Sequence, residues 1–193
     1  EGRPVEFERK FGFAAEDSWA PLSLPSPEGD AELLVRGAID RIDETKGGGF
    51  VVLDYKSSRS YRLRRKLRED ALLSPEFQLP LYAAVLARRN PGARVDAQYV
   101  SIGDARRTTS LREAMERAGV DVDALIETDP GKRSLLRARD PAPPNLADEV
   151  WKRVGDMRAG RFPVRSLSCD FCDLKPLCRI VALPSEDDEG GRG

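Results

Sequence analysis

The apolar positions along the chain predict a mixture of strands and helices. Alternating or β-branched apolar residues predict strands over 5–13, 32–43, 50–56 and 94–103. The segment 44–49, which contains three glycines, predicts the turn of a β-hairpin between the second and third of these strands. The segment 14–30, with three prolines, predicts a loop before that hairpin.

Helical spacing of apolar residues predicts helices over 61–73, 74–89 and 145–159, with one or two shorter helices over 108–140. Ser74 as N-cap, followed by Pro75, marks the start of the second helix. Pro80 lies inside that helix and is expected to disturb its second turn. Asn145 is expected to cap the last helix, and Gly160 to end it.

The size and composition of the chain indicate a globular protein. With 193 residues, 40% hydrophobic and 34% charged, the chain can bury one core. No apolar run approaches the roughly 20 residues that span a bilayer, and the first residues do not resemble a signal peptide, so a cytoplasmic protein without a membrane partner is expected. The chain starts at Glu1 without a methionine, which indicates a fragment that lacks its N-terminal part. Residues 184–193 are acidic and glycine-rich, and a disordered tail is expected there.

The absence of histidine narrows the possible chemistry. It excludes Ser-His-Asp and Cys-His catalysis, a Cys2His2 zinc site and a histidine general base within this chain. Carboxylates, lysine, tyrosine and cysteine remain. The net charge of −1 gives no whole-chain indication of nucleic-acid binding, so only a local basic patch could indicate it.

The hairpin brings two carboxylates together. A turn symmetric about Gly47 places Asp40 opposite Asp54, with Cβ atoms about 4.5–5.5 Å apart. Two like charges at this distance are destabilising unless a cation neutralises them, and oxygen ligands suit Mg²⁺ or Mn²⁺. Lys56 lies two residues after Asp54 and therefore on the same face. This face could hold a metal ion, or Asp40 and Asp54 could be exposed strand-edge carboxylates with Lys56 as a counter-charge.

Three segments carry a family resemblance: GAIDRID at 37–43, VLDYKS at 52–57 and QLPLY at 78–82. In this order they resemble the central motifs of RecB-family nucleases, which belong to the PD-(D/E)XK superfamily. The resemblance extends from Val5 to Cys178. It implies an α/β fold, a restriction-endonuclease-like mixed sheet flanked by helices, in one nuclease domain over 1–183.

The resemblance also implies roles for the hairpin residues. Asp40 and Asp54 would bind Mg²⁺ or Mn²⁺, aided by the backbone carbonyl of Tyr55, and Lys56 would be the catalytic lysine. Many relatives complete the metal shell with a histidine or an acidic residue on a helix before the first strand. This chain has no histidine, and the acidic side chains on its first predicted strand are those of Glu6 and Glu8.

Gln78 and Tyr82 are four residues apart and therefore share one helix face. In the family that the chain resembles, this pair helps to position the scissile strand and supports the metal site. The alternative is that Tyr82 is a core aromatic side chain and Gln78 a solvated polar one.

A basic run follows the proposed catalytic lysine without an acidic interruption: Lys56, Arg59, Arg62, Arg64, Arg65, Lys66 and Arg68. Such a patch suits contacts to a DNA backbone. These contacts are expected from Ser57, Arg59, Arg62, Arg64 and Arg65. Tyr61 could stack on a base. The alternative is a solvated helix face that pairs with Glu69, Asp70 and other carboxylates.

All three cysteines, Cys169, Cys172 and Cys178, lie close together within 165–180. Three thiolates need a fourth ligand to complete a zinc or iron–sulfur site. The spacing resembles the C-terminal cysteine triplet of AddB-type helicase–nuclease subunits and of CRISPR-associated adaptation nucleases. It implies a [4Fe–4S] cluster whose fourth cysteine lies outside this chain. The alternative is a set of unligated, reduced cysteines.

These observations predict a metal-dependent DNA nuclease, with exonuclease activity, that serves as the nuclease module of a bacterial helicase–nuclease in double-strand-break repair. Its expected partners are DNA and a helicase region or subunit of the same complex. Two other hypotheses remain: a stand-alone RecB-like exonuclease or CRISPR adaptation nuclease, and a nuclease-like module that binds DNA or a partner without cutting.

Overall fold

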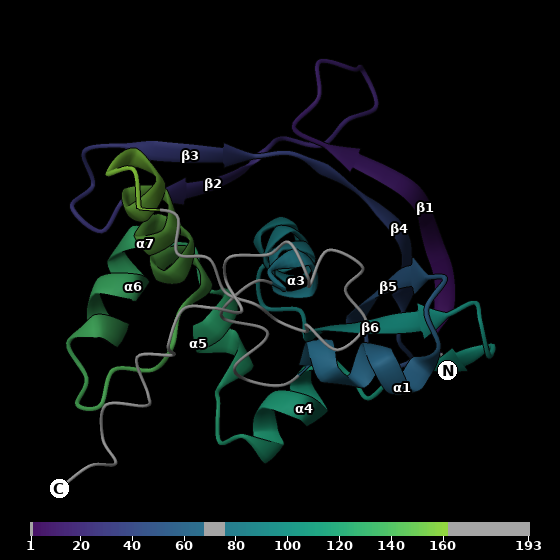
Figure 1. Cartoon of the computed structure of the whole chain (residues 1–193). Coiled ribbons are helices and arrows are strands. Elements are labelled where there is room, and N and C mark those ends of the chain that lie inside the picture. The colour runs from purple at the N-terminus through teal and green to yellow at the C-terminus, as the bar shows by residue number, and fades with distance from the viewer. Residues whose placement is uncertain (1, 68–75, 162–193) are drawn as a thin grey trace, which may run out of the picture. The chain divides into compact units, whose positions relative to one another are not determined.

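The computed structural model describes residues 2–67 and 76–161, with only the backbone of Arg65. Five strands form the main sheet in the order β1 (Arg3–Phe11), β4 (Gly37–Glu44), β5 (Phe50–Lys56), β6 (Val95–Ser101) and β7 (Arg106–Arg107) (Figure 1). The β5–β6 pair is parallel and the other pairs are antiparallel. The predicted mixed sheet is therefore confirmed, and its parallel pair requires a crossover connection between β5 and β6.

The hairpin has the predicted register. Arg41 pairs with Leu53 and Glu44 with Phe50, so one further step places Asp40 opposite Asp54. The turn needs glycine because Gly48 has a φ of 76°, and a Cβ on Gly49 would lie 2.5 Å from the carbonyl oxygen of Arg94.

A second, two-stranded sheet was not expected. β2 (Leu22–Pro25) pairs antiparallel with β3 (Glu32–Val35), so the predicted loop over 14–30 contains a strand, and the predicted strand over 32–43 divides at Arg36. Leu22 and Leu24 are buried, and this burial outweighs the nearby prolines. Pro25 is the last residue of β2. Both strands of a two-stranded sheet are edge strands, so the N–H that Pro25 lacks costs the sheet little.

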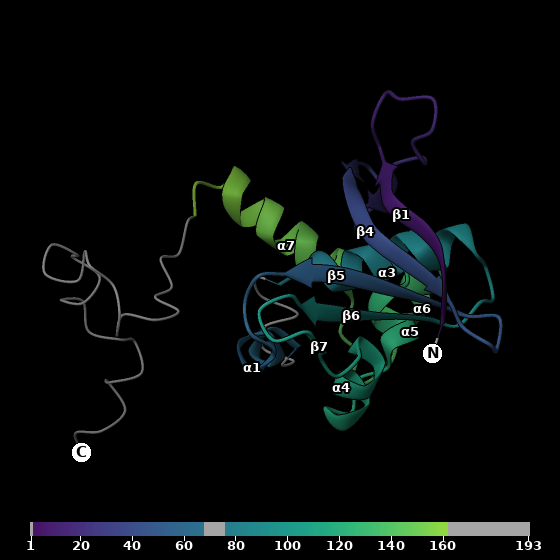
Figure 2. The same ribbon diagram turned by 90° about the vertical axis from the view of Figure 1, so that its right-hand side faces the viewer.

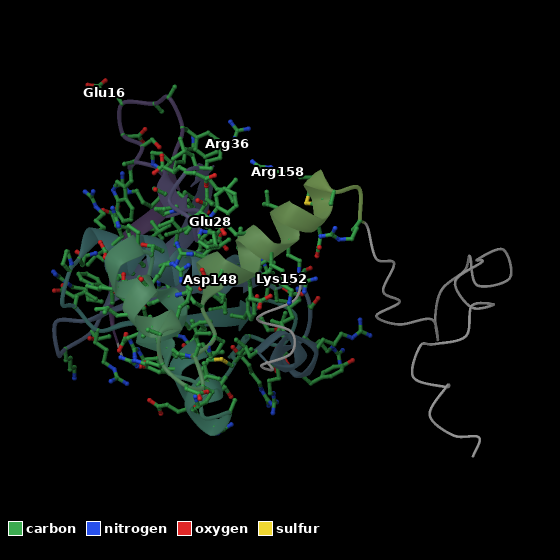
Figure 3. The ribbon with its side chains drawn as sticks, turned by 90° about the vertical axis from the view of Figure 1, so that its left-hand side faces the viewer. Glu16, Glu28, Arg36, Asp148, Lys152 and Arg158 are labelled. Atoms are coloured by element: carbon green, nitrogen blue, oxygen red, sulfur yellow. The ribbon has the colours of Figure 1, made fainter. Side chains whose placement is uncertain are left out.

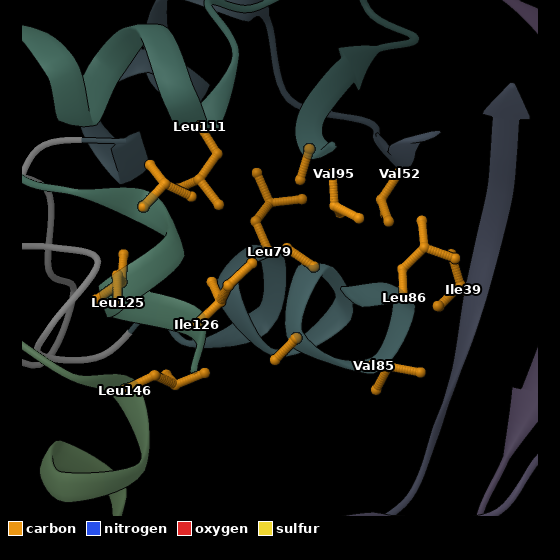
Figure 4. Close-up of a cluster of buried hydrophobic side chains, with 14 of the residues drawn as sticks. Ile39, Val52, Leu79, Val85, Leu86, Val95, Leu111, Leu125, Ile126 and Leu146 are labelled. Atoms are coloured by element: carbon orange, nitrogen blue, oxygen red, sulfur yellow. The ribbon is translucent and has the colours of Figure 1, made fainter. Parts of the chain in front are cut away.

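Helix α3 (Gln78–Arg89) forms the centre of the core. In Figure 2, α3, α5 (Val122–Ile126) and α6 (Pro130–Arg137) lie on the far side of the sheet. Figure 4 shows side chains of α3, among them Leu79 and Leu86, facing Val52 and Val95 of the sheet. All four side chains are at most 1% exposed, and burial of each contributes about 1.5–3 kcal/mol.

The start of α3 corrects the sequence prediction. Glu76 and Phe77 are not helical and the helix begins at Gln78, while Ser74 and Pro75 lie outside the described residues. Pro80 is therefore the third residue of the helix. Backbone N–H groups of the first turn have no acceptor within the helix, so Pro80 removes no hydrogen bond and the expected disturbance does not occur.

The remaining helices are short except for the last. They are α1 (Ser60–Leu63), the 3₁₀ helix η1 (Arg64–Leu67), α4 (Leu111–Arg117), α5 (Val122–Ile126), α6 (Pro130–Arg137) and α7 (Leu146–Arg158). Three helices, rather than one or two, occupy 108–140. Asn145 caps α7 as predicted, because its Oδ1 accepts the backbone N–H groups of Ala147 and Asp148.

The chain divides into two units, Glu1–Arg153 and Val154–Gly193, with the boundary inside α7. Of the second unit, the structure describes the end of α7 and the residues up to Arg161, whose guanidinium group pairs with Asp156 at 2.9 Å. No helix among the described residues is long and apolar enough to cross a membrane.

Candidate active site

The end of β5 and the start of α3 bring four predicted site residues together. Asp54 and Lys56 lie on the same face of β5, and the Lys56 Nζ is 2.6 Å from the Asp54 Oδ2. The same ammonium donates to the Gln78 Oε1 at 2.9 Å, and the Gln78 Nε2 donates to the Tyr82 hydroxyl at 3.1 Å. A continuous set of contacts therefore runs from a buried carboxylate to the second turn of α3.

The side chain of Asp40 is fixed to the neighbouring strand. Its Oδ2 accepts the backbone N–H of Tyr55 at 2.8 Å. Tyr55 lies between Asp54 and Lys56, so this bond ties Asp40 to the centre of the DYK motif. The Tyr55 side chain lies on the opposite face, where its hydroxyl accepts a hydrogen bond from Arg41 at 3.3 Å.

The electrostatics of Asp54 favour an added cation. Its side chain is 1% exposed, and burial raises its pKa, as does the charge of Asp40, while the Lys56 ammonium lowers it. Its Oδ2 lies 2.6 Å from the Lys56 ammonium, the only charge-neutralising contact that the described residues give it. Carboxylate oxygens are the ligands that hard divalent cations prefer, and a second positive charge would further offset the cost of burying this carboxylate.

The side chains at this site suit Mg²⁺ or Mn²⁺, ions that proteins can hold with few ligands of their own. Within 2–67 and 76–161, no three His, Cys, Asp or Glu side chains gather as a metal site. Asp40 and Asp54 are the two carboxylates that the structure places at the end of this hairpin. Magnesium is commonly bound by one or two carboxylates while water and substrate phosphate fill its other positions, so this sparse set is sufficient.

Tyr99 is a site residue that the sequence analysis missed. The parallel register pairs Tyr99 of β6 with Asp54. The ring is fully buried, and the Lys56 Nζ lies 5.8 Å from its centroid. Burial raises the pKa of Tyr99, and among the described residues its hydroxyl has no hydrogen-bond partner. The apolar alternation of β6 marks Tyr99 as buried, but only the strand pairing places it beside Asp54.

The Tyr82 ring packs against the end of β1 and the start of β4. The rings of Tyr82 and Phe11 meet edge to face with centroids 6.1 Å apart. A Cβ on Gly37 would lie 3.0 Å from the Phe11 ring and 3.6 Å from the Tyr82 ring. The glycine of the first motif therefore allows β4 to approach Tyr82 closely.

The basic segment is anchored by a carboxylate from a distant turn. Asp104, between β6 and β7, accepts the backbone N–H of Ser60 at 3.2 Å and the Ser60 hydroxyl at 2.7 Å. Hydrogen bonds from Ser101 and Ser60 lower the pKa of Asp104. Asp104 thereby accepts the Ser60 N–H at the start of α1, which has no acceptor within the helix.

The predicted DNA-contacting side chains of this segment are exposed: Ser57, Arg59, Arg62 and Arg64. Tyr61 is 53% exposed, and the guanidinium group of Arg62 lies 5.7 Å from its ring centroid. Lys66, by contrast, pairs with Glu76 at 2.7 Å. The side chain of Arg65 and all of Arg68 lie outside the described residues, as do Cys169, Cys172 and Cys178.

Comparison with known proteins defines the class. The sequence profile of the PD-(D/E)XK nuclease superfamily matches residues 1–179. The chain therefore belongs to the PD-(D/E)XK nuclease superfamily, whose members typically use divalent metal ions. A search of curated proteins found no match to the chain.

Proposed function

We propose that this chain is a metal-dependent deoxyribonuclease domain, extending over 1–183, whose metal ligands are Asp40, Asp54 and the carbonyl of Tyr55. The observation that carries the proposal is the position of Lys56, which contacts the buried carboxylate of Asp54 and is oriented by Gln78. Two carboxylates and one lysine on adjoining strands are the groups needed for phosphodiester hydrolysis.

The chain's own residues have separable tasks in this reaction. A bound Mg²⁺ or Mn²⁺ would supply Lewis-acid stabilisation of the phosphate and an activated water. Lys56 places a positive charge where negative charge develops on the phosphate. Gln78 fixes the Lys56 ammonium through its Oε1, and Tyr82 accepts the hydrogen bond of the Gln78 amide.

DNA is the proposed substrate and partner. The exposed arginines of α1 and η1 follow Lys56 directly, so phosphates bound to them would lead the strand toward the site. Ser57 and Arg59 lie between Lys56 and α1 and would make the nearest contacts. Tyr61, half exposed beside Arg62, offers a surface for a base.

The proposed biological setting is the exonuclease module of a bacterial helicase–nuclease in double-strand-break repair, with a helicase region or subunit as partner. The RecB-like motifs and the cysteine triplet support this setting. Cys169, Cys172 and Cys178 would hold a [4Fe–4S] cluster with one cysteine from outside this chain, since three thiolates leave one ligand position open. A stand-alone exonuclease or CRISPR adaptation nuclease is the second candidate.

Degradation of linear and covalently closed circular DNA, with Mg²⁺, Mn²⁺ or EDTA, tests this proposal. Lys56→Ala should reduce the rate on the order of 10²-fold or more, because it removes a transition-state charge. Lys46→Ala is the matched control, since Lys46 is an exposed lysine in the hairpin turn. Cutting of linear DNA alone supports an exonuclease. Wild-type activity in folded Lys56→Ala would contradict the catalytic assignment.

A further inference from the structure

The loop between β1 and β2 closes on itself and holds its first residues in place. The Gly12 N–H donates to the Trp19 carbonyl at 2.8 Å, and the Trp19 N–H donates to the Lys10 carbonyl at 3.0 Å. The Phe13 N–H donates to the Ser18 hydroxyl at 3.1 Å. The φ of 76° at Gly12 turns the chain at this point, which positions Phe13 before any ligand binds.

The base of this loop is braced by the side chain of Trp19. Guanidinium groups lie 5.4 Å (Arg9) and 4.4 Å (Arg89) from its ring centroid, and they come from β1 and from the end of α3. Two cation–π contacts on one indole attach the loop to the sheet and to the central helix.

Phe13 is exposed in spite of this bracing. Its ring is 42% exposed, and the guanidinium group of Arg36, itself an exposed residue, lies 5.5 Å from the ring centroid. A Cβ on Gly12 would lie 2.7 Å from the Cβ of Arg36, so the two chain segments are in direct contact. The result is an aromatic ring and a cation held side by side at the surface.

This pair is close in the chain to two residues that contact Tyr82 of the candidate active site. The Phe11 ring meets the Tyr82 ring edge to face, and a Cβ on Gly37 would lie 3.6 Å from the Tyr82 ring. Phe13 follows Phe11 by two residues, and Arg36 directly precedes Gly37. Two residues span at most about 7 Å of chain. The backbone of Phe13 and of Arg36 is therefore within this span of the two residues that contact Tyr82, and it belongs to a different chain segment from the basic helix that follows Lys56.

A similar pair elsewhere provides a comparison. Phe7 is 63% exposed, with the guanidinium group of Arg41 at 5.9 Å from its centroid. Arg41 is adjacent to Asp40 on β4, so its side chain points to the opposite face of the sheet. The two pairs share their chemistry, but Phe7–Arg41 lies on the face of the sheet opposite to Asp40, where Arg41 contacts the Tyr55 hydroxyl.

We propose that Phe13 and Arg36 form a subsite for an unpaired nucleotide of the DNA strand. A base would stack on the Phe13 ring, and Arg36 and the exposed Lys10 would meet its phosphates. Paired bases stack on one another and do not offer a free face, so the subsite selects single-stranded or frayed DNA. Figure 3 shows Glu16 at the outer end of the loop and Arg36 nearer its base, which separates the acidic tip from this cationic part. The inference rests on the proposed function.

Binding measured in EDTA tests the subsite without cleavage. Fluorescence anisotropy would compare a labelled oligothymidylate with a blunt hairpin duplex, for wild type, Phe13→Ala, Phe13→Trp and the control Phe7→Ala. Phe13→Ala should weaken oligothymidylate binding about 5- to 150-fold, the range that loss of one stacked base gives, and duplex binding much less. Phe13→Trp should bind like wild type, and the added indole fluorescence should be quenched by the oligonucleotide.

Four results would overturn the subsite: no binding of oligothymidylate by wild type, unchanged binding by Phe13→Ala, equal losses on both DNAs, or the same loss in Phe7→Ala. Cleavage with Mg²⁺ or Mn²⁺ is scored separately. A wild type that binds through Phe13 but does not cut would refute the proposed function and retain the subsite. A wild type that cuts, with Phe13→Ala unaffected in binding, would refute the subsite alone.

Discussion

Replacement of Gln78 by alanine tests whether the contacts around Lys56 form one working unit. In the structure the Gln78 Oε1 accepts a hydrogen bond from the Lys56 ammonium at 2.9 Å, and its Nε2 donates to Tyr82 at 3.1 Å. The variant leaves Lys56 in contact with Asp54 but without the group that orients it toward the substrate. Gln78 is therefore expected to be a positioning residue whose loss affects turnover more than folding.

The magnitude follows from the kind of bond that is lost. A hydrogen bond to a charged group contributes about 1.5–3 kcal/mol. A change of about 1.4 kcal/mol in the barrier is tenfold in rate, so kcat should fall about 10- to 150-fold in Gln78→Ala. Because Gln78 acts through Lys56, adding Gln78→Ala to Lys56→Ala should change the rate by less than twofold, a strongly non-additive pair.

Steady-state cleavage of linear DNA gives kcat and KM for the four proteins of this cycle. Gln98→Ala is the matched control, since Gln98 of β6 alternates with Tyr99 and its side chain points away from the site. Thermal unfolding checks that each variant is folded. Activity of Gln78→Ala within threefold of wild type, or additive losses in the double variant, would refute the reasoning.

Three further predictions concern the metal, the DNA and the cysteines. Mg²⁺ should raise the unfolding midpoint of wild type but not of Asp54→Asn, since binding at 100 times Kd stabilises by about 2.7 kcal/mol; an equal rise in both would remove Asp54 from the metal site. Substituting Arg62, Arg64 and Arg65 together with glutamine should flatten the slope of log K against log salt by about 0.7–0.9 per lost phosphate contact, and an unchanged slope would place the DNA elsewhere. Anaerobically purified intact protein should contain iron and acid-labile sulfide that Cys172→Ala loses, whereas stoichiometric zinc without iron would identify a zinc site.

The sequence by itself determined the local parts of the site. The register that sets Asp40 opposite Asp54 depends only on a short glycine-rich turn, so it could be worked out by counting from Gly47. The shared face of Asp54 and Lys56 follows from the two-residue period of a strand. The cap of α7 was also predictable from a local pattern, because the Asn145 side chain bonds to N–H groups two and three residues ahead.

Features that depend on distant segments could not be obtained in this way. The segment 22–25 contains a proline and follows another, yet it is a strand because its leucines are buried and β3 pairs with it. Pro80 is harmless only because α3 begins at Gln78. Arg133, fully buried, donates to the carbonyl of Pro25 and pairs with Asp148, and no local pattern brings these three residues together.

The tertiary structure alone decided which aromatic side chains distant segments bring to Asp54 and to Arg36. Tyr99 lies beside Asp54 because β6 runs parallel to β5, and the register of a parallel pair is set by how the intervening helix packs rather than by a turn. Phe13 and Arg36 are neighbours because Gly12 packs against Arg36, the residue between β3 and β4. Packing stabilises the closure of this long chain segment, and no local sequence pattern predicts it. Local patterns therefore place Asp54 and Lys56 on one face of the hairpin, while long-range packing places Tyr99 beside them.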